Sequence, residues 1–327
     1  MEPIDFVVLW VDGADPAWQA EFKKFRQEAG MDTSEIRYRD WGTLPYLFRS
    51  IELYAPWVRK VHFITWGHLP SWLNTSHPKL NIVRHTDYIP HKWLPTFNSN
   101  VIELNLCRID DLAEHFVLLN DDMFMTRPCT PEDFFRNGLP CDMARLSVVR
   151  HSSIASIILN NLRLINDTHS RSMLNKNIGK WIAPCYGMSN ILKTLSLLPW
   201  SFYPAFYDSH QMQPYLKKDF KRAWELWEKE LSNTSSHYFR STDDVSHWLI
   251  RYDFMCRGQF VPRSMNDTKL LTLTDQTVDS IAESISQAKQ RLLCINDSAD
   301  IINFEEVCLK LQKGFEKLMP NRSLFEK

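Results

Sequence analysis

The stretch FVLLNDDMFM (116–125) places an asparagine and two aspartates directly after four apolar residues. A run such as Phe116–Leu119 has the length and composition of a buried strand, and the ligands of open α/β sheets lie just beyond the carboxyl ends of strands. We therefore expect Asp121 and Asp122 at a ligand-facing edge of a sheet. The alternative interpretation is that Asn120 and Asp121 only begin a turn, which both residue types favour.

The two adjacent carboxylates indicate a metal site. Like charges near a low-dielectric core repel each other strongly unless a cation offsets them. Magnesium and manganese take oxygen ligands and are commonly held by one or two carboxylates together with the phosphates of a substrate. Asp121 and Asp122 are therefore the predicted ligands of Mg²⁺ or Mn²⁺.

The first third of the chain alternates between strand-like and helix-like segments. Phe6–Val11 is a continuous apolar run that ends in turn residues. Further strands are expected at Val61–Trp66 and Leu80–Val83, and helices at Ala17–Ala29, Leu44–Tyr54 and Asn98–Leu112. In the last helix Asn100 stands three residues before Glu103, as in a capping box. This order predicts an α/β layered domain with a largely parallel sheet.

The rest of the chain is predicted to add helices to this core. Residues 139–227 are less periodic and resemble a helical and loop insertion that covers a site. Val278–Leu293 and Phe304–Leu318 have the apolar spacing of amphipathic helices. We expect one compact unit made of an α/β core (1–145), an insertion with the second half of the site (146–275) and C-terminal helices packed on the core (276–327).

Composition and motifs argue against several functions. The chain of 327 residues has 38 basic and 39 acidic residues and a net charge of −1, which disfavours a general affinity for nucleic acid. The sequence contains neither G-x-G-x-x-G nor G-x-x-x-x-G-K-[ST]. Dinucleotide-dependent hydride transfer and P-loop kinase chemistry therefore lose their main support.

Cysteine usage and the first residues favour a cytoplasmic protein. The seven cysteines are widely spaced and form no C-x-x-C pair, a pattern typical of free thiols. Glu2 and Asp5 stand where a signal peptide would carry basic residues, and no apolar run is long enough to span a bilayer.

Four blocks of the sequence resemble the Stealth family, the bacterial capsular polysaccharide phosphotransferases that are related to the catalytic subunit of the animal N-acetylglucosamine-1-phosphotransferase. They contain LWVDG, LPTFNSNVIE with NDD, DSHQMQPY, and FRSTDDVS, and they span 4–18, 37–124, 180–225 and 239–260. The resemblance implies a Rossmann-like, GT-A-like core with a helical lobe.

The resemblance also implies a reaction. A sugar 1-phosphate would pass from a nucleotide-activated sugar to a hydroxyl of a glycan or lipid-linked glycan acceptor in capsular or exopolysaccharide synthesis. The products would be a phosphodiester and a nucleoside monophosphate. Such chemistry needs a cation for the diphosphate, a basic group for the phosphoryl oxygens and a base for the hydroxyl proton.

The second block carries the residues expected at the metal and the diphosphate. The resemblance assigns the metal first to Asp122 and then to Asp121. Glu103 matches the Glu of the family's LPTF motif, with a helix cap as the structural alternative. Asn98 and Ser99 begin the same helix, where free N–H groups favour an anion.

The nucleotide is expected at the end of the first strand. Trp10, Asp12 and Gly13 lie at its carboxyl end, and Asn120 follows a second strand. Asp12 could bind ribose or base, or only begin the turn. Arg49 could face phosphate, although a solvated helix arginine is the more common case.

Proton transfer is assigned to the last two blocks. His210 is the expected general base, because imidazole changes charge closest to neutral pH. Pro214 lies four residues on, whereas the family commonly has H-x-P. Arg240 is expected to stabilise charge on the transferred group, and Asp244 to orient His210 or to act as the base. Lys176 and Lys180 are weaker candidates that a solvated loop explains equally well.

Two rival functions stay open at this point. A metal-dependent glycosyltransferase would move only the sugar and release a nucleoside diphosphate. A non-catalytic glycan-binding protein would use some of the 12 tryptophans without needing the acidic pair, His210 and Arg240 together. The expected cytoplasmic location is compatible with peripheral association with a capsule-synthesis complex at the inner face of the membrane.

Overall fold

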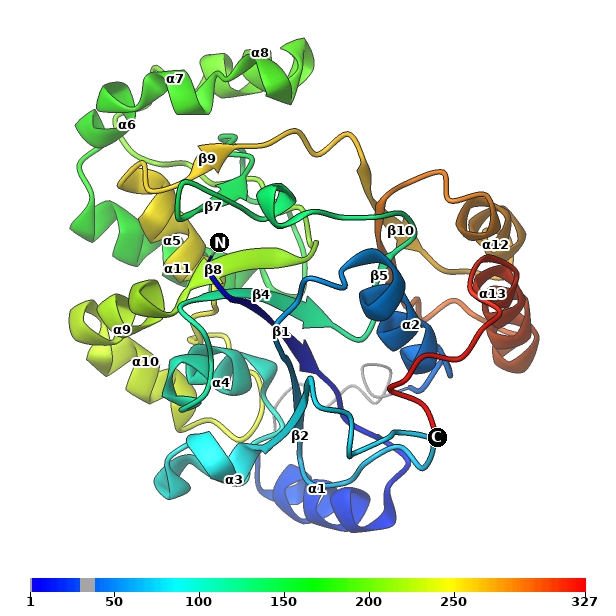
Figure 1. Ribbon diagram of the computed structural model, residues 1–327. Helices are drawn as coiled ribbons and strands as arrows, with labels where there is room; N and C mark the ends of the chain where they lie inside the picture. Colours follow the sequence, from blue (N-terminus) through cyan, green and yellow to red (C-terminus); the bar gives the residue numbers. More distant parts are fainter. Residues whose placement is uncertain (1, 30–38) are drawn as a thin grey trace.

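A five-stranded sheet lies at the centre of the computed structural model, which describes residues 2–29 and 39–327 (Figure 1). Its strands, in spatial order, are β3 (Leu80–Arg84), β2 (Val61–Thr65), β1 (Ile4–Leu9), β4 (His115–Asn120) and β8 (Gln213–Leu216). The first four are parallel, and β8 pairs with β4 in the antiparallel sense. The strand order reverses at β1, beside β4, so a topological switch point lies at their carboxyl ends.

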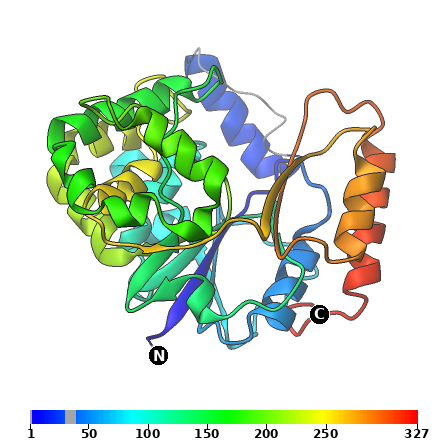
Figure 2. The same ribbon diagram turned by 90° about the horizontal axis from the view of Figure 1, so that it is seen from above.

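Alternating side chains bury both faces of this sheet. Val7 and Phe116 belong to one hydrophobic core together with residues of the helical lobe. Phe6 and Val117 belong to a second core with residues of α2 (Leu44–Tyr54) and of the C-terminal helices. Parallel sheets are normally covered on both faces in this way. Figure 2 shows the lobe in green and yellow, and the C-terminal helices in orange and red, on opposite sides of the sheet.

Helices α5–α11 form the helical lobe on one face of the sheet. The lobe consists of α5 (Ala155–Thr168), α6 (Ser172–Lys176), α7 (Ile178–Trp181), α8 (Met188–Leu197), α9 (Lys217–Leu226), α10 (Glu228–Ser235) and α11 (Trp248–Cys256). The remaining helices are α1 (Pro16–Ala29), α3 (His85–Tyr88), α4 (Ser99–Leu104), α12 (Val278–Ser286) and α13 (Phe304–Leu318). Among the described residues, every helix is too short or too polar to cross a membrane.

Two small sheets flank the central one. The first has the order β10 (Thr268–Thr272), β11 (Leu292–Asn296), β5 (Met123–Met125). Its register pairs Cys294 with Met123, which brings β11 beside the acidic pair. The second consists of β6 (Phe135–Arg136), β7 (Leu139–Asp142) and β9 (Val261–Pro262).

The predicted α/β class, with a largely parallel sheet and a helical lobe, is confirmed, but two helices were predicted wrongly. The expected helix Asn98–Leu112 ends at Leu104, and its N-cap is Asn98, whose side chain accepts a hydrogen bond from the backbone of Asn100. The expected helix Val278–Leu293 ends at Ser286. Its last two residues belong to the buried strand β11.

Candidate active site

The carboxyl ends of β1 and β4 meet at one edge of the sheet. Leu9 lies opposite Asn120 in the register, so the residues that follow each strand are neighbours. Asp12 begins a turn, because its Oδ1 accepts a hydrogen bond of 2.8 Å from the backbone of Ala14. Its own N–H donates to Nε2 of His68 at 2.6 Å. Asp12 therefore does begin the turn, and its half-buried side chain lies beside Gly13. Contact of Asp12 with ribose or base stays a prediction.

Trp10 occupies the hydrophobic core. Its ring is buried and stacks on Phe63 with 5.4 Å between centroids. The prediction that Trp10 contacts substrate is therefore wrong. A tryptophan at a strand end contributes more by filling the space between sheet and helix than by meeting solvent.

Asp122, His210 and Cys294 form a cluster that could hold a metal ion. One ligand atom from each lies within 4.8 Å of the other two. Oδ2 of Asp122 accepts a hydrogen bond of 3.3 Å from the Cys294 thiol. The buried Oδ1 has no hydrogen-bond partner among residues 2–29 and 39–327. His210 has a φ of 46°, a left-handed conformation that histidine tolerates better than most residues.

The electrostatics of the acidic pair fit a bound cation. Burial, together with the charge of the neighbouring Asp122, raises the pKa of Asp121 to about 7. Burial also raises the pKa of Asp122, while His210 opposes that rise. A cation bound here would remove the cost of keeping both carboxylates ionised.

The identity of that cation depends on Cys294. A thiolate would favour a softer metal than Mg²⁺. However, burial and the adjacent Asp122 raise the pKa of the Cys294 thiol, and the thiol donates its hydrogen bond to Asp122. Within this cluster, the oxygen atoms of Asp122 are therefore the ligands that suit a hard divalent cation. Asp121, the second predicted ligand, is adjacent in sequence but is not one of the three residues of the cluster.

A pocket beside this cluster collects four of the predicted residues. Glu103, Asn120, His210 and Arg240 all line it, although they come from four separate segments of the chain. The other lining residues are Asn100, Leu118, Met123, Ile154, Ile157, Ile158, Gln211, Gln213, Ser246, His247 and Trp248. The isoleucines from α5 and the segment before it provide an apolar wall, which lowers the local dielectric and strengthens charge interactions in the pocket.

Glu103 faces the pocket and forms no cap. Burial raises the pKa of Glu103 to about 7, against the opposing effects of Arg240 and of a hydrogen bond with Ser99. Nε2 of His247 lies 3.8 Å from its Oε2. A carboxyl group poised near neutral pH is suited to proton transfer. The predicted alternative of a helix-cap glutamate is therefore wrong.

His247 is a pocket residue that the sequence analysis missed. Its Nδ1 lies 2.6 Å from the hydroxyl of Tyr215 on β8. Burial, together with the nearby His210, lowers the pKa of His247 to about 3, which favours the neutral imidazole. Its position at the start of α11, within seven residues of Arg240, was the only signal in the sequence.

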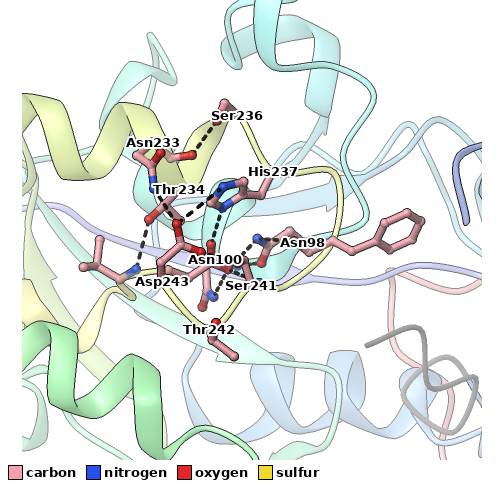
Figure 3. A network of polar contacts seen from close by, with 12 residues as sticks. Asn98, Asn100, Asn233, Thr234, Ser236, His237, Ser241, Thr242 and Asp243 are labelled. Atoms are coloured by element: carbon pink, nitrogen blue, oxygen red, sulfur yellow. Dashed lines mark hydrogen bonds and ion pairs between the residues drawn. The ribbon is translucent and has the colours of Figure 1, made fainter. Parts of the chain in front are cut away.

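Asp244 is fully buried. Its partners Asn98, Asn100, His237 and Ser241 belong to the network of polar contacts in Figure 3. Its carboxylate accepts hydrogen bonds from Nδ2 of Asn98 at 2.8 Å and from Nδ2 of Asn100 at 3.1 Å. It also accepts one from the backbone of Ser241 at 3.1 Å, and Nδ1 of His237 lies 2.7 Å away. The predictions that Asp244 acts as a base or orients His210 are therefore wrong, because its oxygens are already engaged by these partners.

The network instead joins α4 to the loop that carries Arg240. Nη2 of Arg240 donates a hydrogen bond of 2.6 Å to Oγ of Ser99. Asn98 is fully buried between its cap contact and Asp244, so the prediction that it binds substrate is wrong. Ser99, in contrast, directly contacts Arg240, which lines the pocket.

Arg49 ties α2 to the C-terminus. Its Nε and Nη2 each donate to a different oxygen of Glu326 at 2.9 Å. Its Nη1 donates to Glu316 at 3.0 Å and to the carbonyl of Met319 at 2.8 Å. The prediction that Arg49 binds substrate is wrong, because four of the five N–H groups of the buried guanidinium already donate to protein acceptors.

Of the two weaker candidates, one is structural. Nζ of Lys180 donates to the carbonyls of Gly258 at 2.6 Å and Phe260 at 2.8 Å. Lys176 is exposed on α6. Neither lines the pocket.

The fold and site define an α/β protein of the class that binds ligands at the switch point of a parallel sheet. Three family models match: Stealth protein CR1, conserved region 1, at residues 2–29, CR2, conserved region 2, at 37–142, and CR3, conserved region 3, at 209–257. The chain belongs to the Stealth family. The third model spans His210, Arg240 and Asp244, which the sequence analysis had divided between two blocks.

Several named relatives match this chain along nearly their full length. A capsular polysaccharide phosphotransferase, WcwK, of Streptococcus pneumoniae is 42% identical over 100% of this chain and 99% of its own. A receptor polysaccharide phosphotransferase, WefC, of Streptococcus oralis is 37% identical over 100% of both chains. An exopolysaccharide phosphotransferase, cps2G, of Lactiplantibacillus plantarum is 35% identical over 99% of this chain and 96% of its own.

The galactosyltransferase LgtC, solved with donor and acceptor sugar analogues, aligns with 94% of this chain and 95% of its own at 10% identity, with a TM-score of 0.37. This TM-score is too low for the structural similarity to support a conclusion.

Proposed function

We propose that the protein transfers a sugar 1-phosphate from a nucleotide-activated sugar to a hydroxyl of a glycan acceptor in capsular or exopolysaccharide synthesis. The observation that carries this proposal is the pocket in which Glu103, His210 and Arg240 converge beside Asp122. The names of the full-length relatives, all phosphotransferases of polysaccharides, support the same reaction.

The donor would lie across the carboxyl ends of β1 and β4. Asp12, Gly13 and Asn120 are at the edge where nucleotides bind in this class of sheet. A magnesium or manganese ion held by Asp122 and Asp121 would supply charge neutralisation for the diphosphate. The donor's sugar-linked phosphate would then face the pocket and Arg240.

In the transfer itself, the acceptor oxygen forms a bond to the phosphorus of the sugar phosphate. The bond from that phosphorus to the oxygen of the nucleoside monophosphate breaks, and the monophosphate leaves with its electron pair. Arg240 stabilises the charge on the phosphoryl oxygens, because its guanidinium is held by Ser99 at the pocket. His210 takes the proton of the acceptor hydroxyl.

Release of nucleotide tests the proposal. The protein is incubated with a panel of nucleotide sugars, magnesium and a glycan acceptor, and the products are separated by mass spectrometry. The expected products are a nucleoside monophosphate and a phosphodiester-linked sugar, absent with Asp122→Asn and present with Asp243→Asn, whose side chain is exposed. A nucleoside diphosphate would show sugar transfer alone, and no nucleotide release with any donor would favour a binding protein.

A further inference from the structure

One helix of the lobe carries an exposed apolar face. Met188, Leu192 and Leu195 of α8 are spaced at i, i+4 and i+7, so they lie on one side of the helix, and their exposed fractions are 69%, 56% and 41%. Just beyond the helix, Trp200 is 54% exposed and Phe202 is 45% exposed, with 5.7 Å between their ring centroids. We call these five residues the α8 face. Figure 1 shows α8 at the outer edge of the lobe.

The α8 face is not needed to hold the helix on the protein. The opposite side of α8 provides that attachment: the hydroxyl of Thr194 accepts a hydrogen bond of 3.3 Å from the backbone of Leu146. Leu197 and Leu198, at the end of α8, pack against the core of the lobe. A side of a helix that exposes large apolar residues in a group marks an interaction surface.

The charges around the α8 face identify its partner. Residues 168–207 contain four basic residues and no acidic residue, although the whole chain has a net charge of −1. Lys176 and Lys193 of this segment are exposed, on α6 and on α8 itself. Apolar and aromatic side chains in a segment that carries lysines and no acidic residue match a bilayer surface with anionic lipids.

We propose that the α8 face docks on the surface of an anionic lipid bilayer. Leu192, Trp200 and their neighbours enter the boundary between headgroups and acyl chains, and the two lysines contact lipid phosphates. The proposal deepens the proposed function and rests on it. Helix α5 belongs to the same lobe as α8, and its Ile157 and Ile158 line the active-site pocket. Docking would hold this pocket near an acceptor that is itself anchored in the membrane by a lipid.

Vesicle co-sedimentation of the full-length protein tests the proposal. Vesicles of phosphatidylcholine alone are compared with vesicles that also contain phosphatidylglycerol. The protein is expected to bind the anionic vesicles and to bind less at high salt, because ions screen the lysines. Leu192→Gln/Trp200→Gln is expected to weaken this binding by more than about tenfold, since two large apolar side chains lose their burial.

Charge and control variants complete the experiment. Lys176→Gln and Lys193→Gln are each expected to weaken binding to anionic vesicles by about fivefold. The matched control is Leu309→Gln on α13, where the leucine is 57% exposed, and it is expected to bind like the wild type. Failure of the wild type to bind anionic vesicles at low salt, or equal binding by Leu192→Gln/Trp200→Gln, would overturn the proposal. If either of these results is found and the protein self-associates through the α8 face, that face is assigned to a second copy of the chain.

This test is independent of catalysis. None of the substituted residues lines the pocket, so turnover of a water-soluble acceptor is expected to be unchanged in all four variants. If the proposed transfer is wrong, the protein still binds vesicles. If docking is wrong, the transfer still proceeds.

Discussion

Arg240 donates a hydrogen bond of 2.6 Å to the hydroxyl of Ser99, across 141 residues of sequence. The same serine forms a hydrogen bond with the carboxyl group of Glu103, whose pKa the positive charge of Arg240 lowers. From the sequence alone, these residues are expected to have separate roles. In the structure they form one unit, in which the cation and the acid influence each other's charge.

Glu103→Gln is expected to stabilise the fold at high pH. Burial raises the pKa of Glu103 to about 7, so the folded protein keeps a proton that the unfolded chain loses from about pH 4.5 upward. The free energy of unfolding therefore falls between about pH 4.5 and 7, by up to about 3 kcal/mol. Glutamine does not ionise, so the variant does not lose this stability as the pH rises. Urea denaturation at pH 4 and pH 8 measures the free energy of unfolding of both proteins.

The expected pattern for Glu103→Gln is little change at pH 4 and a gain at pH 8, accompanied by reduced turnover. Glu305→Gln, at an exposed glutamate of α13, is the control and is expected to show no such pH dependence. An equal effect at both pH values would show that ionisation of Glu103 costs the fold nothing.

His210→Ala is expected to lower turnover by roughly 10²–10⁴-fold, the usual contribution of a positioned acid or base, with little change in the affinity for the donor. Steady-state kinetics and donor titration separate the two effects. His91→Ala, at an exposed histidine, is the control. Near-normal turnover of His210→Ala would transfer the role of base to Glu103, the other group of the pocket suited to proton transfer.

Asp122→Asn is expected to lower turnover by more than about 100-fold. This is the usual effect of removing one group that stabilises charge in a transition state. The substitution keeps the shape of the side chain and removes the charge that a hard cation requires. A chelator should likewise abolish turnover of the wild type, and added magnesium should restore it. Full activity in the chelator would refute the metal site.

Asp244→Asn is expected to lower the free energy of unfolding by about 1–3 kcal/mol, because one of its oxygens becomes a donor that faces other donors. The loop with Arg240 loosens, so kcat should fall as well. Asp243 precedes Asp244 in the chain, and its side chain is 60% exposed. Asp243→Asn should therefore lower the free energy of unfolding by less than about 1 kcal/mol. Wild-type stability of Asp244→Asn would mean that the network does not hold this loop.

Arg49→Lys is expected to lower the free energy of unfolding by about 1–3 kcal/mol, because lysine cannot contact both oxygens of Glu326 in parallel. The KM for the donor should not change. Arg127→Lys, at an exposed position, is the control for stability. A raised KM without loss of stability would return Arg49 to the substrate site.

The strands of the sheet were predictable because buried strands are short apolar runs. The runs that begin at Phe6, Val61, Leu80 and Phe116 each overlap one strand, although the first two extend one or two residues beyond the strand end. Helix ends were less predictable. At the end of α4, the side chain of Asn105 donates to the carbonyl of Val101, a local contact that competes with continuation of the helix.

Strand β11 was missed because its apolar run also fits a helix. Leu292–Ile295 continues the apolar pattern of the preceding helix, and periodicity alone does not separate the two. Its partners, Met123–Met125 and Thr268–Thr272, are remote in sequence. The same strand brings Cys294 to Asp122, so the prediction missed this member of the site as well.

The chemistry of the site was easier to predict than the partner of each charge. Residue types and their spacing were sufficient to predict several residues of the pocket. They did not predict that Arg49 pairs with Glu326, which lies 277 residues away. Asp244 meets Asn98 and Asn100, which lie 146 and 144 residues away. Only the tertiary structure decides whether such a group faces substrate or is neutralised by the protein.

Strand β8 has a consequence for the synthesis of the chain. Until Gln213–Leu216 leaves the ribosome, β4 is an unpaired edge with free N–H and C=O groups, open to wrong pairing with other chains. Once β8 arrives, Pro214 lies opposite Val117 in the new outer strand, where it lacks the N–H that a further strand would need. A nascent chain that stops before residue 213 is therefore both inactive and prone to aggregation, whereas the finished chain closes this edge with its own sequence.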